Sequence, residues 1–279
     1  MISLFFLEDG LFSLEDASKI EQFERTKHLE RNAKIFGKDY KNLKSIPTLY
    51  KYLNKLQSKK TLGLKEDFVF YKTHSGLFEI GGNAFTYEQN CRGIIYVIRD
   101  PRDVCISWSK HSGISLEESI NFMKNDYSSI YWQEPKTKNN VFSEDIRPRA
   151  FLSSWEKHVI SWTSSKWKIP ILVLKFEDLV YEKSNTIKKI IKFFEEKYSF
   201  NFKNKEEKIE NIIKSTEFNK LKNEENEKGF IEATKNQNFF SEGKKNQWVE
   251  KLTDKQINEL EVKFAKVMGN FNYKLKVEF

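Results

Sequence analysis

Short apolar runs alternate with amphipathic segments along most of this chain. Runs of strand length cover residues 68–71, 93–98 and 171–174, and the last two are rich in isoleucine, valine and leucine. Apolar positions at helical spacing follow both of these runs. Strands that alternate with helices predict an α/β fold, in which a parallel sheet carries helices on both faces.

The periodicity also places helices and one long loop. We expect Gly81-Gly82-Asn83 to form a tight turn, and residues 124–147, which are polar with scattered aromatic rings, to form an irregular binding loop. Residues 1–12 resemble the end of a buried helix. Further helices are expected at residues 18–29, 49–56, 101–111, 116–123, 151–162 and 254–267, through the apolar stripe 187–194, and around Ile209, Ile212 and Ile213.

The corner after the run 93–98 carries the strongest chemical signal. A buried strand ends on Arg99, Asp100 can cap the next helix, Pro101 fits its first position, and Asp103 stands where a capping-box carboxylate would. Ser107 follows two helical turns after Arg99. A cation beside helix N–H groups suits a phosphate. The alternative is a structural corner in which Arg99 pairs with Asp100 or Asp103.

Composition limits the partners. The 279 residues hold 48 Lys and Arg against 40 Asp and Glu, a net charge of +8, which suits a polyanionic ligand. We expect no nucleic-acid partner, because no basic stripe or recognised binding motif accompanies the charge. We also expect no membrane partner, because no apolar run approaches the ~20 residues of a membrane span.

Cysteines, histidines and linkers add further expectations. Cys91 and Cys105 make no disulfide framework, which favours a reducing compartment, and residues 1–7 lack signal-peptide features, so a cytoplasmic location is expected. The four histidines show no ligand spacing with cysteine, so no metal is expected. No Pro/Gly/Ser-rich linker divides the chain, which favours one domain over residues 1–279.

Two segments resemble one family closely. Tyr96-Val97-Ile98-Arg99-Asp100-Pro101-Arg102-Asp103-Val104, with Ser107, resembles the 3′-phosphate-binding segment of sulfotransferases that use 3′-phosphoadenylyl sulfate (PAPS). Phe70-Tyr71-Lys72-Thr73-His74 looks like the same family's catalytic strand end. The resemblance implies that Arg99 and Ser107 hold the 3′-phosphate, that His74 is the base and that Lys72 stabilises the transition state. Alternation along a strand places Lys72 and His74 on one face.

The resemblance continues towards the C-terminus and implies a nucleotide site. It places Thr216, Phe218 and Phe176 along the adenine, with Phe176 where many members carry tyrosine. Gly243 and Lys244 match the segment after the family's Phe-x-Arg-Lys-Gly. Its Arg-Lys pair, which also grips the 3′-phosphate, is replaced by Ser241-Glu242, and Lys244 and Lys245 are the candidates to supply that charge.

A second departure concerns the start of the chain. The family's Pro-Lys-Ser-Gly-Thr-type donor loop, which cradles the 5′-phosphosulfate, has no match. The expected fold is therefore a P-loop NTPase-like sulfotransferase fold that is N-terminally truncated, without its first strand and donor loop.

The function expected from these residues is sulfuryl transfer from PAPS to a hydroxyl or amine of a small-molecule acceptor, with adenosine 3′,5′-bisphosphate as the second product. Two alternatives stay open at this point. One is a non-catalytic or degenerate relative that binds the bisphosphate weakly or not at all. The other is a P-loop kinase, which predicts a preference for ATP and magnesium dependence. The sequence identifies neither the acceptor nor the oligomeric state.

Overall fold

The computed structural model describes residues 11–18, 20–23, 43–57, 69–132, 147–164, 166–233 and 237–276. The chain forms two compact units. Unit 1 comprises Met1–Lys19, Ile94–Asn121 and Pro170–Phe279, and unit 2 comprises Ile20–Gly93 and Phe122–Ile169. That residues 1–279 act as one domain stays a prediction.

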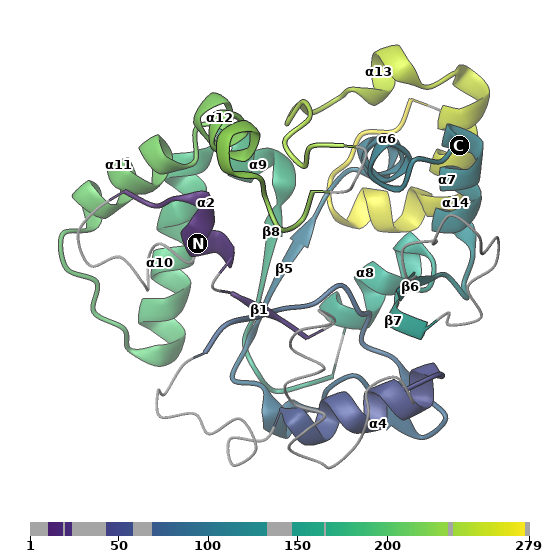
Figure 1. The fold of residues 1–279 in the computed structure, drawn as a ribbon, viewed down its shortest axis with the longest axis horizontal. Helices are drawn as coiled ribbons and strands as arrows, with labels where there is room; N and C mark the ends of the chain where they lie inside the picture. The colour runs from purple at the N-terminus through teal and green to yellow at the C-terminus, as the bar shows by residue number, and fades with distance from the viewer. Residues whose placement is uncertain are drawn as a thin grey trace. The chain divides into compact units, whose positions relative to one another are not determined.

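Unit 1 is built on two parallel strands, β5 (Ile94–Ile98) and β8 (Ile171–Lys175), which lie side by side in Figure 1. Ile94 pairs with Ile171 and Ile98 with Lys175. Both strands were expected from their apolar runs, and both are confirmed. Because parallel strands end at the same edge, the residues after β5 and β8 are brought together there.

Helix α6 (Pro101–Ser112) begins directly after β5. The side chain of Asp100 accepts a hydrogen bond from the Arg102 N–H at 2.9 Å, and Pro101 occupies the first helical position. The helix ends at Gly113, which has the left-handed φ of 67° that glycine adopts without strain. The expected strand, cap and helix are therefore all confirmed.

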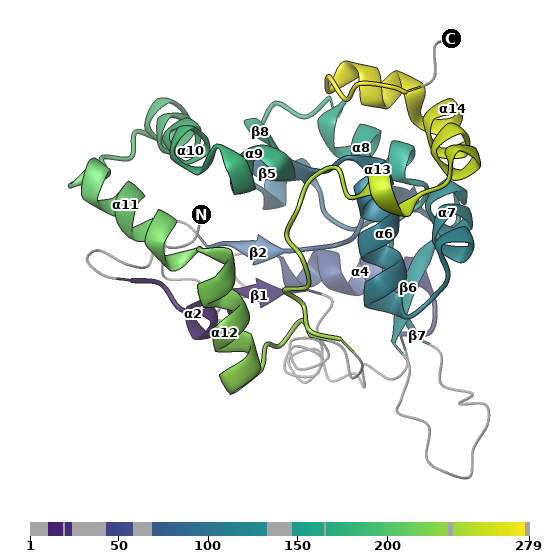
Figure 2. The ribbon, with the colours of Figure 1, turned by 90° about the horizontal axis from the view of Figure 1, so that it is seen from above.

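Apolar stripes of two long helices form much of the core of unit 1. Helix α10 (Lys183–Tyr198) packs against β8, and α14 (Asp254–Asn270) packs against α6, as Figure 2 shows. A capping box of Thr253 and Gln256 starts α14. The other helices in the described residues of unit 1 are α2 (Leu14–Ser18), α9 (Phe176–Tyr181), α11 (Lys205–Ser215), α12 (Phe218–Lys228) and α13 (Trp248–Lys251). Helix α7 (Leu116–Lys124) crosses the boundary of the units.

In its described residues, unit 2 combines short strand pairs with helical segments. β1 (Glu21–Gln22) pairs in parallel with β2 (Tyr71–Lys72), and the expected turn at Gly81 and Gly82 joins the antiparallel β3 (Glu79–Ile80) and β4 (Asn83–Ala84). β6 (Ser129–Trp132) pairs antiparallel with β7 (Arg147–Phe151). The helical elements are α4 (Ile46–Leu56), α8 (Trp155–Thr163) and the 3-10 turn Glu88–Asn90.

Several expected elements are wrong in the described residues. Glu21–Gln22 is a strand inside the segment expected to be helical, and residues 11–12 are not helical. Strands β6 and β7 occupy parts of the segment that was expected to be irregular. Each of these strands exists through pairing with a remote partner, which local periodicity does not report. The rest of the expected helices at residues 1–10 and 24–29, and residues 133–146 of the loop, lie outside the described residues.

Candidate functional site

Arg99 lies at the carboxyl end of β5 and is held on two sides. Its guanidinium carbon is 4.3 Å from the centroid of the Phe176 ring, the first residue after β8. Its Nη2 donates a hydrogen bond to the carbonyl of Lys244 at 3.2 Å, and its buried Nε makes no hydrogen bond. Burial lowers the pKa of Arg99 from its ordinary value, and the charges of Asp103 and Glu177 oppose that shift. The cation is therefore fixed before any ligand arrives.

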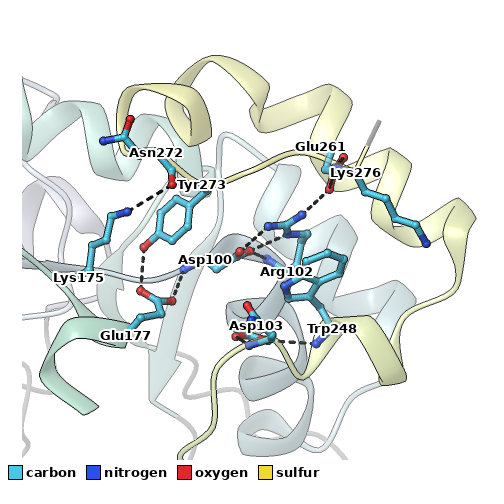
Figure 3. Close-up of polar contacts among 11 residues, drawn as sticks. Asp100, Arg102, Asp103, Lys175, Glu177, Trp248, Glu261, Asn272, Tyr273 and Lys276 are labelled. Carbon is cyan, nitrogen blue, oxygen red and sulfur yellow. Dashed lines mark hydrogen bonds and ion pairs between the residues drawn. The ribbon is translucent and has the colours of Figure 1, made fainter. Parts of the chain in front are cut away.

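Arg102, and not Arg99, is the arginine that pairs with Asp100. Its Nε and Nη2 donate to the two carboxylate oxygens of Asp100 at 2.9 and 2.6 Å, and its Nη1 donates to Glu261 at 2.5 Å (Figure 3). The guanidinium carbon lies 3.7 Å from the centroid of the Trp248 ring. Arg102 is 2% exposed and Glu261 is 0% exposed, so this network is part of the core beneath the corner.

Asp103 does not close a capping box. Its carboxylate accepts hydrogen bonds from the backbone N–H groups of Asn246, at 2.8 Å, and Trp248, at 3.1 Å (Figure 3). Burial raises the pKa of Asp103, while the charge of Arg99 and these N–H groups lower it. The first turn of α6 therefore anchors the segment 243–248, which carries Lys244.

Glu177 takes the position that the sequence assigned to Asp103. Its Oε1 accepts the backbone N–H of Asp100 at 3.0 Å, and its Oε2 accepts the hydroxyl of Tyr273 at 3.1 Å (Figure 3). The N-cap of α6 is thus completed by a carboxylate from α9, 77 residues away in sequence.

Phe218 and Gly243, two of the candidate nucleotide-binding residues, are in direct contact. Gly243 has a φ of +61°, and a Cβ atom on it would lie 2.5 Å from two carbons of the Phe218 ring. Only glycine fits this approach. Glu225 holds the preceding turn in place, because its buried carboxylate accepts the N–H groups of Phe239 and Phe240 at 2.5 and 2.8 Å.

Two other candidate residues lie near this region without bonding to Arg99. Thr216 donates its hydroxyl to the carbonyl of Ile212 at 2.8 Å, and its own carbonyl accepts the ammonium of Lys183 at 2.5 Å. Ser107 is exposed on α6. Within the part of the chain that the structure describes, no hydrogen bond joins Arg99 to Ser107 or Thr216.

In unit 2, the strand β2 leads directly to the two candidate catalytic residues. Lys72 ends β2, and the side chain of His74, two residues later, is exposed. The backbone of the following residues is held by α8: the ring Nε2–H of His158 donates to the carbonyl of His74 at 3.1 Å, and the indole N–H of Trp162 donates to the carbonyl of Ser75 at 3.1 Å. His158 and Trp162 therefore anchor this segment to α8.

The anchoring histidine makes a pH-dependent contribution to stability. Burial lowers the pKa of His158 from 6.5 to about 4. Between these two values the unfolded chain binds a proton that the folded chain does not, so the free energy of unfolding should fall as the pH decreases from 6.5 towards 4. We expect His158→Gln to reduce the difference in this free energy between pH 7 and pH 5, measured by urea unfolding.

The control for His158→Gln is His111→Gln, which replaces an exposed histidine in the last turn of α6. This variant should keep the wild-type pH dependence. The assignment would be wrong if His158→Gln showed the same loss between pH 7 and pH 5 as the wild-type chain.

The described residues show neither a metal-binding group nor a membrane-spanning helix. They contain no group of three or more His, Cys, Asp or Glu side chains that could hold a metal ion. Among the same residues, every helix is too short or too polar to cross a bilayer.

Comparison with known proteins identifies the family. The model of the sulfotransferase domain matches residues 12–272. The chain belongs to the sulfotransferase domain family. The fold agrees, because the crystal structure of mouse sulfotransferase SULT7A1 complexed with PAP matches 76% of this chain and 70% of that one, with a TM-score of 0.51 and 20% identity. The expected α/β fold class is confirmed.

Curated sulfotransferases match at low identity. Luciferin sulfotransferase of Photinus pyralis is 26% identical over 130 residues, which are 47% of this chain and 29% of the relative. The 3-beta-hydroxysteroid sulfotransferase of Cavia porcellus is 24% identical over 188 residues, 65% of this chain and 58% of the relative. Sulfotransferase 2A6 of Mus musculus is 34% identical over 100 residues, which are 36% of this chain and 30% of the relative. The matched part of this sulfotransferase chain thus spans less than two thirds of each of these relatives.

Proposed function

We propose that this chain transfers a sulfuryl group from PAPS to a hydroxyl or amine of a small molecule. One observation carries the proposal: the guanidinium of Arg99 is held between the Phe176 ring and the Lys244 carbonyl at the carboxyl end of β5. A fixed guanidinium beside the N-terminus of α6 is suited to a phosphate dianion. The solved mouse sulfotransferase, which is complexed with PAP, supports the same class of ligand.

In this proposal the nucleotide lies along unit 1. Arg99 and Ser107 hold the 3′-phosphate, while the ring of Phe218, backed by Gly243, stacks on the adenine. Thr216 lies two residues before Phe218 and contributes its hydroxyl oxygen as an acceptor. Phe176 acts through Arg99, because one face of its ring is covered by the guanidinium.

The proposed chemistry assigns the proton to His74. The acceptor O–H or N–H gives its proton to the imidazole, the acceptor atom bonds to sulfur, and the bond from sulfur to the bridging oxygen of the bisphosphate breaks. The ammonium of Lys72 stabilises the negative charge that develops on the leaving oxygen. Exposure of the His74 side chain, with its backbone anchored to α8, supports this role.

A ligand-dependent melting temperature tests the nucleotide part. At ~100-fold the dissociation constant, adenosine 3′,5′-bisphosphate adds about 2.7 kcal/mol of stability, which corresponds to a shift of roughly 5–10 °C for a chain of this size. We expect this shift with the bisphosphate and not with ADP. We also expect Arg99→Ala to lose it, because the variant removes the fixed cation.

Arg92→Ala is the matched control, since it removes an exposed arginine shortly before β5. It should keep the wild-type shift. A good unfolding transition without any shift would favour the non-catalytic alternative, and a shift with ADP alone would favour a kinase. A small-molecule acceptor, a cytoplasmic location, and the lack of a nucleic-acid, membrane or metal partner stay predictions.

A further inference from the structure

Glu242 binds two lysines through a single carboxylate oxygen. Its Oε1 accepts hydrogen bonds from the ammonium groups of Lys110, on α6, and Lys251, on α13. These two cations lower the pKa of Glu242 to about 2, so the carboxylate is ionised at neutral pH. All three side chains are about one third exposed, so a dissolved anion can reach them.

The lysines belong to the same polar chain as Arg99. The carbonyl of Lys244 accepts hydrogen bonds from Arg99 Nη2, at 3.2 Å, and from Gln247 Nε2, at 3.0 Å. The other amide atom of Gln247, Oε1, accepts the ammonium of Lys251 at 2.9 Å. One continuous set of hydrogen bonds therefore links Arg99, through Lys244 and Gln247, to Lys251 and Glu242.

Helix α6 brings the second lysine to the same face as Ser107. Lys110 follows Ser107 by three positions, which is the spacing of neighbours on one helix face. Arg99 and Ser107 are the candidate phosphate ligands. Hydrogen bonds connect Arg99 to Lys251, and Ser107 lies on the same face of α6 as Lys110.

The charges define what this cluster can bind. Two ammonium groups and one carboxylate leave a net charge of +1, and Arg99 adds another. Each ammonium has three N–H donors, and a phosphate offers more acceptor oxygens than the single carboxylate oxygen that they share. The carboxylate is nevertheless attached to the same chain, so a phosphate must compete with it for the two cations.

We propose that Lys110 and Lys251 complete the 3′-phosphate site and that Glu242 competes with the phosphate for both of them. The inference rests on the proposed function, because it takes the ligand to be a 3′-phosphorylated nucleotide. It assigns the cationic role to Lys110 and Lys251, and not to the side chains of Lys244 and Lys245. The ammonium of Lys245 lies 4.4 Å from the centroid of the Tyr181 ring. Glu242 then sets how tightly this chain holds its nucleotide.

Titration calorimetry of two nucleotides tests the competition. Adenosine 3′,5′-bisphosphate carries the 3′-phosphate, and adenosine 5′-monophosphate lacks it. We expect Glu242→Gln to tighten binding of the bisphosphate by about two- to fivefold, the range expected when a partly exposed ion pair no longer competes. Binding of the monophosphate should change less than twofold.

The matched control is Glu196→Gln, which removes an exposed carboxylate paired with Lys192 on α10. It changes the net charge equally and should leave both affinities unchanged. The second variant is Lys110→Gln, which should weaken binding of the bisphosphate a few-fold without affecting the monophosphate. This variant tests the proposal even if Glu242→Gln does not fold.

The outcomes separate this inference from the proposed function. If the bisphosphate binds in an Arg99-dependent manner but neither Glu242→Gln nor Lys110→Gln changes its affinity, the inference is wrong and the function stands. If Glu242→Gln tightens both nucleotides equally, the effect is a general one of charge and the inference is wrong. If the bisphosphate binds neither to the wild type nor to Glu242→Gln, both are wrong. Binding to Glu242→Gln alone supports both.

Discussion

His74→Ala should lower kcat by about 10²–10⁴-fold, the range for loss of a general base, while affinity for adenosine 3′,5′-bisphosphate stays unchanged. The side chain of His74 is exposed, and its backbone carbonyl is held by His158. Replacement of the ring therefore removes a proton acceptor and leaves the anchored segment in place. The measurement is transfer of labelled sulfate from PAPS to phenol, 1-butanol and aniline as trial acceptors, with nucleotide affinity measured in parallel.

Two comparisons make this result specific. His111→Ala removes another exposed histidine and should keep the wild-type kcat. Lys72→Ala should also lower kcat, because the ammonium that offsets charge in the transition state is lost. Full activity of His74→Ala with any of the three acceptors would rule out His74 as the base for that acceptor.

Glu261→Ala is the substitution expected to cost most stability, about 3–5 kcal/mol. The carboxylate is 0% exposed and accepts the Nη1 of Arg102 at 2.5 Å and the backbone N–H of Lys276 at 3.0 and 2.9 Å. Its removal leaves Arg102, whose side chain is 3% exposed, with Asp100 as its remaining carboxylate. Because Nη1 of Arg102 and the N–H of Lys276 then lose their buried acceptor, the core around α6 and α14 should weaken.

Urea unfolding at pH 7 measures this cost, with Glu196→Ala as the control. Glu196 pairs with Lys192 at 3.6 Å on the exposed face of α10, and surface pairs of this kind contribute about 0–1 kcal/mol. Glu261→Gln keeps an acceptor for Arg102 and should cost less than Glu261→Ala. Equal losses for the buried and the exposed glutamate would contradict the role given to Glu261.

The corner from β5 to α6 could be predicted from sequence because its determinants are local. An apolar run, Asp100 as the cap and Pro101 at the first helical position follow one another within residues 93–101. The apolar run of β8 and the stripe of α10 were visible for the same reason. Each signal needs only propensity and periodicity over one short window.

The residues that support the candidate site were missed because their roles are long-range. The sequence did not show that Glu177, Glu225 and Glu261 each accept backbone N–H groups from another part of the chain. Asp103 was expected to cap its own helix and instead binds a segment more than 140 residues away. One sequence signal for such a role was available. Glu261 falls on the apolar stripe of its helix, where a carboxylate needs a partner.

The contact of Asp103 with the N–H groups of Asn246 and Trp248 has a consequence for ligand recognition. The segment 243–248 lacks regular structure for most of its length, yet it cannot shift without breaking hydrogen bonds to the first turn of a core helix. A nucleotide that binds as proposed would therefore meet a surface that is already shaped. Little conformational entropy is left to lose on association, and that preorganisation works in favour of affinity.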